Sequence, residues 1–226
     1  MNDFSLSLLG DSQFARWGTC LELQVELSRL YTHSTFELAN YGLEGARIGN
    51  ALHRICAPFE RDGKTLPPLS FQNPRIVVLE SCAHSQFWDG PEGLSEYRDL
   101  LRRAWDEIER TTTAKTLFCL SAPPPRDRFL EGNPLFFGTS KATRARHADG
   151  VKMYLDEARS IAEDEGWPLA DIGEEIEKRV RSGESVRRFW EQHEGTSLSR
   201  YGFEAAARAL VRELDNNRMV EERIQK

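Results

Sequence analysis

The sequence predicts an α/β protein, a three-layer α/β/α sandwich built around a five-stranded parallel sheet. Along its 226 residues, short apolar runs alternate with stretches in which apolar residues recur at helical spacing. The runs are continuously apolar instead of alternating with polar residues, which is typical of parallel strands covered on both faces. No linker, repeat or low-complexity segment divides the chain, so a single domain over residues 1–226 is expected.

The predicted strands are five apolar runs, most of which end at residues that favour turns. They cover residues 4–9, 35–39, 76–79, 116–120 and 168–172. Gly10 ends the first run, an Asn-Tyr-Gly sequence beginning at Asn40 ends the second, and three prolines from Pro123 follow the fourth. The third run, Ile-Val-Val-Leu, is the strongest and follows an Asn-Pro breaker.

The predicted helices lie between these runs and connect the strands by right-handed crossovers. Apolar residues at near-helical spacing mark each helix. They are Phe14, Trp17, Leu21, Val25 and Leu30 after the first strand; Leu94, Tyr97, Leu101, Trp105 and Ile108 after the third; Val151, Leu155, Ala158 and Ala162 before the fifth; and Phe203, Ala207, Leu210 and Leu214 in the last helix.

Charge and composition exclude several classes of partner. The net charge of -6 argues against a nucleic-acid partner, because such proteins usually carry a clustered basic surface. No apolar run approaches the roughly 20 residues of a membrane span, so no membrane partner is expected. The first residues lack the basic region of a signal peptide. Cys20, Cys56, Cys82 and Cys119 are far apart and form no CxxC pair, which predicts reduced thiols and a cytoplasmic location.

Motifs for metals and cofactors are missing from the sequence. There is no HExxH pair, no carboxylate and histidine cluster at metal-ligand spacing, and no glycine fingerprint after a strand. We therefore expect no metal and no cofactor. Gly63-Lys64-Thr65 is similar to the end of a phosphate-binding loop, but Pro58 stands where that loop needs a glycine, so a turn is expected.

Polar residues gather where the predicted strands end. Parallel strands place their carboxyl ends along one edge, where open α/β folds bind their ligands. Ser12 lies in a Gly-Asp-Ser turn that opens a helix, so backbone N–H groups there could stabilise an oxyanion. The alternative is that Asp11 or Ser12 only caps the helix. Asp11, Asn40 and Ser81 are expected to contact a substrate, and His84 faces the same edge.

Residues 122–149 form a segment that is rich in Pro, Gly and Arg and has little periodicity. Because it follows the fourth strand, we expect a long loop or flap over the site. Arg144 and Arg146 would then be placed to bind an anionic substrate group. The alternative is an insertion with no functional role.

Two sequence blocks carry a resemblance to a known family. The run Leu-Leu-Gly-Asp-Ser ending at Ser12, followed by Asn-x-Gly-x-x-Gly from Asn40 to Gly45, resembles the first two blocks of the SGNH (GDSL-type) hydrolases. The order of the later elements agrees, and residues 194–202 look like the family's Asp-x-x-His block. The resemblance covers nearly the whole chain. It implies a flavodoxin-like fold and the hydrolysis of esters, thioesters or acetylated sugars.

The resemblance also implies roles for single residues. In the family a serine attacks the ester carbonyl, a histidine activates the serine and an aspartate orients the histidine. Ser12 would be the nucleophile, and the N–H groups of Ser12 and Gly45 would form the oxyanion hole. The third block departs from the pattern, since Ala83 replaces the oxyanion asparagine. In the last block Glu194 takes the carboxylate position, but Ser197 takes the histidine position.

The general base must therefore be a histidine at another position. His193 adjoins the carboxylate position of the last block, and His84 ends the third strand beside the lost asparagine. Either could be the base, and both could also be structural. His147 lies in the predicted flap, while His33 and His53 are expected away from the edge.

Two functions remain open from the sequence. The first is an SGNH-like serine hydrolase or acyltransferase that uses Ser12 and a non-standard base on a small acyl or acetyl ester. The second is a catalytically silent protein of the same fold that acts as a binding or assembly module with a protein partner. The second rests on the loss of both the asparagine and the histidine, without which a serine hydroxyl reacts slowly.

Overall fold

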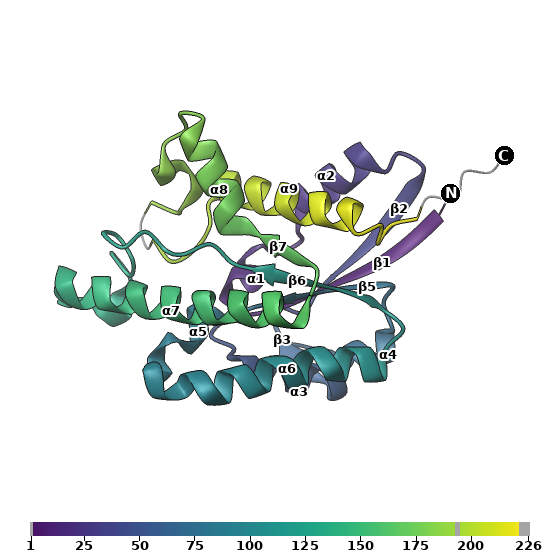
Figure 1. Cartoon of the computed structure of the whole chain (residues 1–226), viewed down its shortest axis with the longest axis horizontal. Helices are drawn as coiled ribbons and strands as arrows, with labels where there is room; N and C mark the ends of the chain where they lie inside the picture. Colours follow the sequence, from purple (N-terminus) through teal and green to yellow (C-terminus); the bar gives the residue numbers. More distant parts are fainter. Residues whose placement is uncertain (1, 193–194, 222–226) are drawn as a thin grey trace.

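The structure is a computed structural model that describes residues 2–192 and 195–221. Within these residues the central sheet has five parallel strands in the order β2-β1-β5-β6-β7 (Figure 1). They are β1 (Asn2–Leu9), β2 (Ser34–Asn40), β5 (Ile76–Glu80), β6 (Lys115–Leu120) and β7 (Leu169–Asp171). The predicted fold class is confirmed, and each strand boundary lies within two residues of its predicted position.

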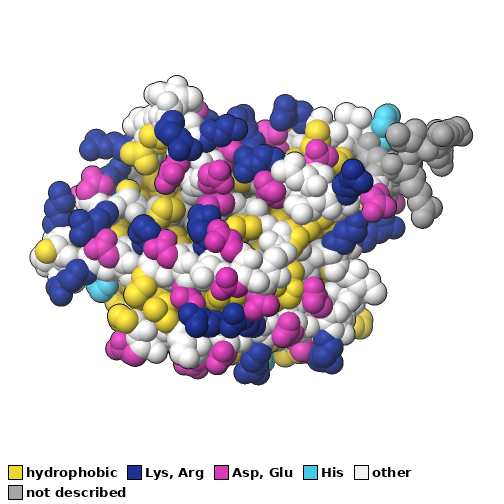
Figure 2. Space-filling model, in the orientation of Figure 1, with side chains coloured by type: hydrophobic (Ala, Val, Ile, Leu, Met, Phe, Trp, Pro, Cys, Tyr) yellow, Lys and Arg dark blue, Asp and Glu magenta, His cyan; other side chains and the backbone are white. Residues whose placement is uncertain are grey.

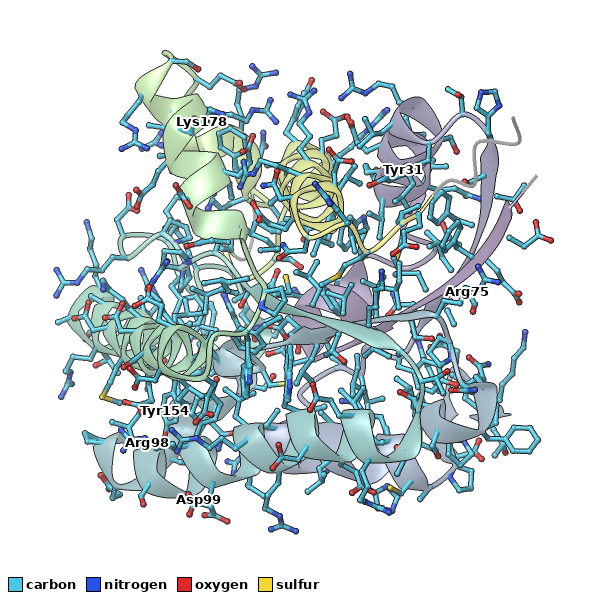
Figure 3. All side chains as sticks on the ribbon, turned by 45° about the vertical axis from the view of Figure 1, so that its right-hand side comes forward. Tyr31, Arg75, Arg98, Asp99, Tyr154 and Lys178 are labelled. Carbon is cyan, nitrogen blue, oxygen red and sulfur yellow. The ribbon has the colours of Figure 1, made fainter. Side chains whose placement is uncertain are left out.

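Helices cover both faces of the sheet (Figure 1). One layer contains α2 (Leu21–Leu30), α8 (Ile172–Arg181) and α9 (Arg200–Asn216), and the other contains α3 (Ile48–Cys56), α6 (Leu94–Thr111) and α7 (Lys141–Glu165). Side chains fill the space between the sheet and both layers (Figure 3). Leu6 and Leu8 of β1 face the first layer, whereas Val77 and Leu79 of β5 face the second. Two buried cores therefore fix the sheet, one on each face.

Several short elements complete the described chain. They are the helices α1 (Ser12–Arg16), α4 (Leu69–Gln72) and α5 (Ala83–Gln86), the 3₁₀ turns Phe87–Asp89, Pro91–Gly93, Pro134–Phe136 and Val186–Phe189, and an antiparallel hairpin of β3 (Phe59–Arg61) and β4 (Lys64–Leu66). The turn of this hairpin lies at Asp62 and Gly63, whose φ angles are 52° and 72°. The sequence predicted a turn over residues 63–65, but Lys64 and Thr65 belong to β4.

The apolar pattern after β1 is divided between α1 and α2. Gly18 and Cys20 both have a positive φ, 57° and 56°, which a helix cannot continue through. Phe14 and Trp17 nevertheless stay buried, because the chain turns α1 back over the end of β1. The short α1 thus starts directly at Ser12, at the carboxyl edge of the sheet.

The segment predicted as a flap, residues 122–149, is only partly a loop. Helix α7 begins at Lys141, with Ser140 as its N-cap accepting a 3.1 Å hydrogen bond from the Thr143 N–H. The irregular connection therefore ends at residue 140, and the last nine residues of the predicted flap are helical. Sequence periodicity missed this helix start because Ala148 is the first buried residue of α7.

Among the described residues, no helix has the length and apolar character needed to cross a bilayer. Side chains of both charge signs are mixed over the face shown in Figure 2.

A close approach of two backbones joins the loop after β2 to α1. A Cβ on Gly42 would lie against the backbone N of Ala15 and the carbonyl carbon of Phe14, closer than real Cβ contacts come. Asn40 bridges the same elements, since its Nδ2 donates to the carbonyl oxygens of Phe14 at 2.7 Å and Gly18 at 2.9 Å. The position of the β2 loop relative to α1 therefore requires glycine at residue 42.

We predict that Gly42→Ala lowers the free energy of unfolding by about 2–3 kcal/mol, because the new methyl group must displace backbone atoms. Gly18→Ala is the matched control: its φ is positive but its Cβ would meet open space, so a loss of about 1 kcal/mol is expected. Urea unfolding measures the loss of unfolding free energy in both variants, provided that the m value is the same as in the wild type. Equal losses for the two variants would contradict the steric argument.

Candidate active site

A cavity of about 430 Å³ opens at the carboxyl ends of β1 and β5. This is the position where the chain crosses from one face of the sheet to the other, and open α/β folds bind ligands there. The cavity has a polar floor, an aromatic wall and a charged rim. The floor residues are Ser12, Gln13, Gly45, His84, Ser85 and Thr196; the wall residues are Phe87, Trp88, Phe129, Leu130 and Phe136; the rim residues are Arg16, Glu44, Arg47 and Asn133.

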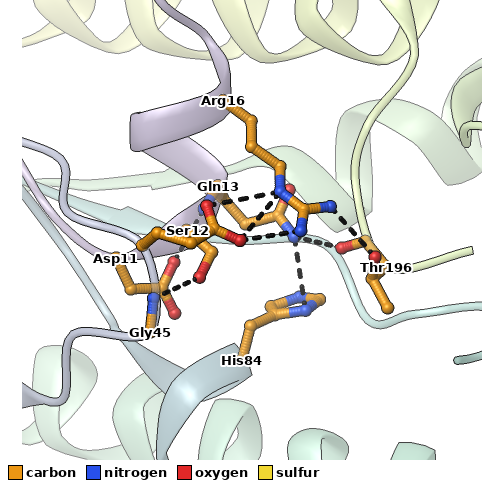
Figure 4. Close-up of polar contacts among 8 residues, drawn as sticks. Asp11, Ser12, Gln13, Arg16, Gly45, His84 and Thr196 are labelled. Carbon is orange, nitrogen blue, oxygen red and sulfur yellow. Dashed lines mark hydrogen bonds and ion pairs between the residues drawn. The ribbon is translucent and has the colours of Figure 1, made fainter. Parts of the chain in front are cut away.

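Ser12 and Gly45, two residues predicted from sequence, meet on the floor of this cavity. Ser12 is the first residue of α1, and its half-buried Oγ accepts a 2.8 Å hydrogen bond from the Gly45 N–H (Figure 4). Gly45 has a φ of 69°, a left-handed conformation in which glycine carries no steric penalty. The turn thus directs a backbone N–H at the atom expected to attack a substrate.

Asp11 lies beneath this floor and does not line the cavity. It caps α1, because its Oδ1 accepts a 2.9 Å bond from the Gln13 N–H. Its own N–H donates to Oε2 of Glu80 at 3.1 Å, and both carboxyl groups are fully buried. Burial raises the pKa of Asp11, and burial together with the Asp11 charge raises the pKa of Glu80 to about 8.

Ser81 and Asn40 were also expected to contact substrate, but both bind other parts of the protein. Ser81 Oγ donates to Oε1 of Glu80 at 2.8 Å and lies 3.1 Å from Oγ of Ser121, in the buried network under the site. The Asn40 amide is engaged with α1, and its Oδ1 accepts a 2.8 Å bond from the Gly42 N–H. Neither residue borders the cavity.

A buried guanidinium connects the loops that follow β1 and β2. Arg54 of α3 is 1% exposed, and its Nη2 donates to the Gly10 carbonyl at 2.9 Å. Its Nη1 donates to the carbonyl of Tyr41, and its Nε donates to Asn50 at 3.1 Å. One side chain thus holds the backbone next to Ser12 and the backbone that leads to Gly45.

Three solved structures resemble this chain over almost its full length. A lipase/acylhydrolase from Enterococcus faecalis superposes with a TM-score of 0.67 at 15% identity, covering 96% of this chain and 97% of the other. A lipolytic protein assigned to the G-D-S-L family from Desulfitobacterium hafniense gives 0.64 at 13% identity, covering 93% and 99%. Axe2, an acetylxylan esterase from Geobacillus stearothermophilus, gives 0.56 at 16%, covering 97% of both chains. Family models and curated proteins yield no sequence match.

The fold is that of the SGNH hydrolases. Within that fold, Ser12 and Gly45 lie where the first two sequence blocks predicted them, at adjacent ends of β1 and β2. Ala83, which replaces the asparagine of the third block, is fully buried and does not line the cavity.

His84 was a candidate base of this SGNH-like site, but its ring is engaged elsewhere. The Gln13 Nε2 donates to the carbonyl of Thr196 at 2.5 Å, which fixes the orientation of that amide. The same amide nitrogen lies 3.4 Å from His84 Nδ1, so Nδ1 accepts and Nε2–H donates to the Ala122 carbonyl at 2.8 Å (Figure 4). The geometry does not support His84 as the base for Ser12, since both ring nitrogens have other partners.

The last SGNH block lies only partly within the described residues. His193 and Glu194, predicted as base and carboxylate, are outside them. Ser197, at the position of the usual histidine, is fully buried and does not line the cavity. Thr196 borders the cavity instead, and its Oγ1 accepts a 3.1 Å bond from Nη1 of Arg16.

The cationic groups at the site are not those that the sequence indicated. Arg144 and Arg146 lie on α7, where they donate to the Thr139 carbonyl and to Thr143 Oγ1, and neither lines the cavity. Arg16 and Arg47 line it instead. The sequence could have predicted both arginines from their positions in the chain. Arg16 is one helical turn after Ser12, and Arg47 is two residues after Gly45.

Acidic partners balance both of these arginines. Nη2 of Arg16 lies 2.7 Å from Glu44, and Nη1 of Arg47 lies 2.8 Å from Asp89. The aromatic wall stands beside them, where Trp88 is 52% exposed and stacks on Phe136 with ring centroids 5.5 Å apart. Together with Asp89, which lies next to it, the rim is therefore polar without a net charge, and the wall is apolar. In the described part of the chain, no group of three or more His, Cys, Asp or Glu side chains is placed to hold a metal ion.

We predict that His84 stays neutral, with its proton on Nε2, throughout the neutral pH range. Burial lowers the pKa of His84 below the ordinary 6.5, so its contribution to stability is present above that pH and lost on acidification. The ¹⁵N shifts of the ring, assigned with His84→Gln, report the tautomer and the titration. A proton on Nδ1, or a titration above pH 6.5, would disprove the assignment.

Proposed function

We propose that this protein is a serine ester hydrolase of the SGNH type, with Ser12 as its nucleophile. The observation that carries the proposal is the 2.8 Å hydrogen bond between the Gly45 N–H and Ser12 Oγ on the floor of the cavity. An acylhydrolase and an acetylxylan esterase among the structures of the same fold support this class of reaction. The substrate is a small ester, thioester or acetylated sugar.

The chemistry follows from the positions of these groups. Ser12 Oγ forms a bond to the acyl carbon, and the carbonyl electron pair moves to oxygen, where the N–H groups of Ser12 and Gly45 stabilise it. The Gly45 N–H leaves Oγ as it takes up this oxygen. The base accepts the hydroxyl proton and passes it to the departing alkoxide or thiolate. Water then cleaves the acyl-serine in the same way, which releases the acid and restores Ser12.

The proposed base is His193, with Glu194 as its carboxylate. Within the described residues, Ser12 Oγ has the Gly45 N–H as its hydrogen-bond partner and contacts no imidazole. His193 is three residues from Thr196, which borders the cavity, so the chain tethers the two Cα atoms within about 11 Å of each other. Because Thr196 and Ser12 line the same cavity, this tether makes His193 the remaining candidate base nearest in sequence to the cavity lining.

The aromatic wall and the neutral rim suit an uncharged ester with an apolar or ring-shaped part. The exposed face of Trp88 offers a flat surface for an acyl chain or a sugar ring. Since Glu44 and Asp89 already neutralise Arg16 and Arg47, a strongly anionic substrate gains little there.

A second candidate function is a silent binding module. Two observations favour it: serine occupies the usual histidine position at residue 197, and Ser12 Oγ is held by Gly45 without an imidazole among the described residues. Such a protein would bind a ligand or a protein partner through the same cavity and would not turn over acyl substrates.

We predict that a fluorophosphonate adds once to the purified protein and that Ser12→Ala abolishes this adduct, because only an activated serine reacts. His193→Ala should lower the labelling rate by about 10²–10⁴, the usual contribution of a general base. Intact-mass spectrometry over time measures both effects.

His53→Ala is the matched control, because His53 is exposed on α3 and outside the cavity, and its labelling rate should equal that of the wild type. A folded wild-type protein without any adduct would refute the hydrolase and support the binding module. An adduct that persists in His193→Ala at the wild-type rate would refute His193 as the base.

A further inference from the structure

Beneath Ser12 lies a buried cluster of charged side chains that the proposed reaction does not use. Asp11, Glu80 and Arg54 come from the end of β1, the end of β5 and α3, and they are 0%, 0% and 1% exposed. Oε2 of Glu80 accepts the Asp11 N–H at 3.1 Å, while Oδ2 of Asp11 is buried without a hydrogen-bond partner among the described residues. Glu80 therefore contacts the residue that immediately precedes the nucleophile.

The Glu80 side chain also packs directly on the backbone of the nucleophile turn. A Cβ on Gly10 would lie 2.8 Å from Cβ of Glu80 and 3.0 Å from its Oε2, so the turn closes over the carboxyl group. Ser81 Oγ donates to the other oxygen, Oε1, at 2.8 Å. Both oxygens of Glu80 are thus fixed by neighbouring groups.

Charge balance determines how many protons this cluster holds. One guanidinium faces two carboxyl groups, so two ionised carboxylates would leave a net negative charge in a buried site, which is costly. A single proton on the two carboxyl groups makes the cluster neutral. Burial and the Asp11 charge raise the pKa of Glu80 to about 8, which places this proton on Glu80 at neutral pH.

We propose that Glu80 is a positioning residue for the nucleophile: its uncharged carboxyl group holds Asp11 under the turn and so keeps Ser12 Oγ opposite the Gly45 N–H. Loss of the proton leaves two adjacent carboxylates with one arginine, and their repulsion displaces the Asp11 turn. The catalytic meaning of this role rests on the proposed function, whereas the positioning itself does not.

The other titratable groups around Glu80 change charge outside the range between pH 6.5 and 9. Burial raises the pKa values of the facing thiols and phenol well above their ordinary values, and it lowers that of the facing imidazole below 6.5. These groups are Cys82 after β5, Cys119 on β6, Tyr97 on α6 and His84 on α5. A transition near pH 8 in this cluster therefore reports the pair of carboxyl groups.

The first test follows the Gly45 amide, because a purely structural role for Glu80 would not couple that amide to a titration. In protein labelled with ¹⁵N-glycine, we expect the Gly45 resonance to move with a midpoint near pH 8 in the wild type. Glu80→Gln is isosteric with the protonated form and cannot ionise, so this movement should be absent. Glu37→Gln, at an exposed carboxyl on β2, is the matched control and should titrate like the wild type.

The second test is stability, whose sign follows from the raised pKa. Stabilisation by the proton on Glu80 is complete below the ordinary pKa of 4.5 and is lost as pH rises through about 8. The urea midpoint of the wild type and of Glu37→Gln should fall between pH 6 and 9, and that of Glu80→Gln should fall less. A Gly45 resonance that is static in the wild type, or that titrates equally in Glu80→Gln, would overturn the proposal.

Labelling of Ser12 separates this proposal from the proposed function. The phosphonylation rate of the wild type should drop about tenfold per pH unit above the transition, as the protonated fraction does, and Glu80→Gln should lack this drop. If Ser12 never reacts while Gly45 titrates as described, the hydrolase is refuted and the positioning role stands. If Ser12 reacts with the same alkaline limb in wild type and Glu80→Gln, the positioning role is refuted and the hydrolase stands.

Discussion

One buried guanidinium holds together the two loops on which the site depends. Arg54 donates to the carbonyls of Gly10 and Tyr41, and so joins the ends of β1 and β2 at the depth where Ser12 and Gly45 emerge. Leaving a buried carbonyl unpaired costs about 1–3 kcal/mol, so these bonds determine the path of both loops. A buried cation in turn needs a compensating carboxylate nearby, which explains why Asp11 and Glu80 lie under Ser12.

The site divides into a floor and a wall that depend on different interactions. The floor is formed by the segments that follow the strand ends. The Asp11 N–H ties it to Glu80 of the buried cluster, and the Gly45 N–H ties its two loops together at Ser12. The wall comes from the turn after α5 and from the connection after β6, and it is held by aromatic contacts such as Trp88 on Phe136. Substitutions in the wall can therefore change which ligand fits the cavity while the geometry at Ser12 stays the same.

The sequence predicted the features that depend on neighbouring residues in the chain. It missed the roles of side chains whose partners are distant in the chain. The strands were found because parallel strands are continuously apolar. Ser12 and Gly45 were found because each belongs to a short sequence block that begins at a strand end and resembles a known family. The role of His84 could not be read, because Gln13 from α1 and the Ala122 carbonyl after β6 determine its tautomer. The same holds for Asn40, whose amide partners lie on another element.

The arginines show a second reason why the sequence did not predict the residues that line the cavity. Arg144 was placed at the site because a Pro-rich, aperiodic segment was read as a loop through residue 149, but α7 begins at Lys141 with a turn of polar residues. Helical periodicity depends on a buried stripe, and the first residues of α7 have none. Arg16 and Arg47 were not considered, although their positions beside Ser12 and Gly45 placed them at the same edge.

The two departures from the SGNH pattern have different consequences for chemistry. Ala83 is enclosed in the core, so residue 83 presents no side-chain donor to the cavity, and the reaction proposed above uses backbone N–H groups for the oxyanion. Removal of one oxyanion donor typically costs 10²–10³ in rate, roughly 3–4 kcal/mol. The missing histidine at Ser197 is different, because the same block contains another histidine, His193, three residues before Thr196, which borders the cavity. In the hydrolase proposed above, the last block can therefore still supply an imidazole, whereas position 83 supplies no amide.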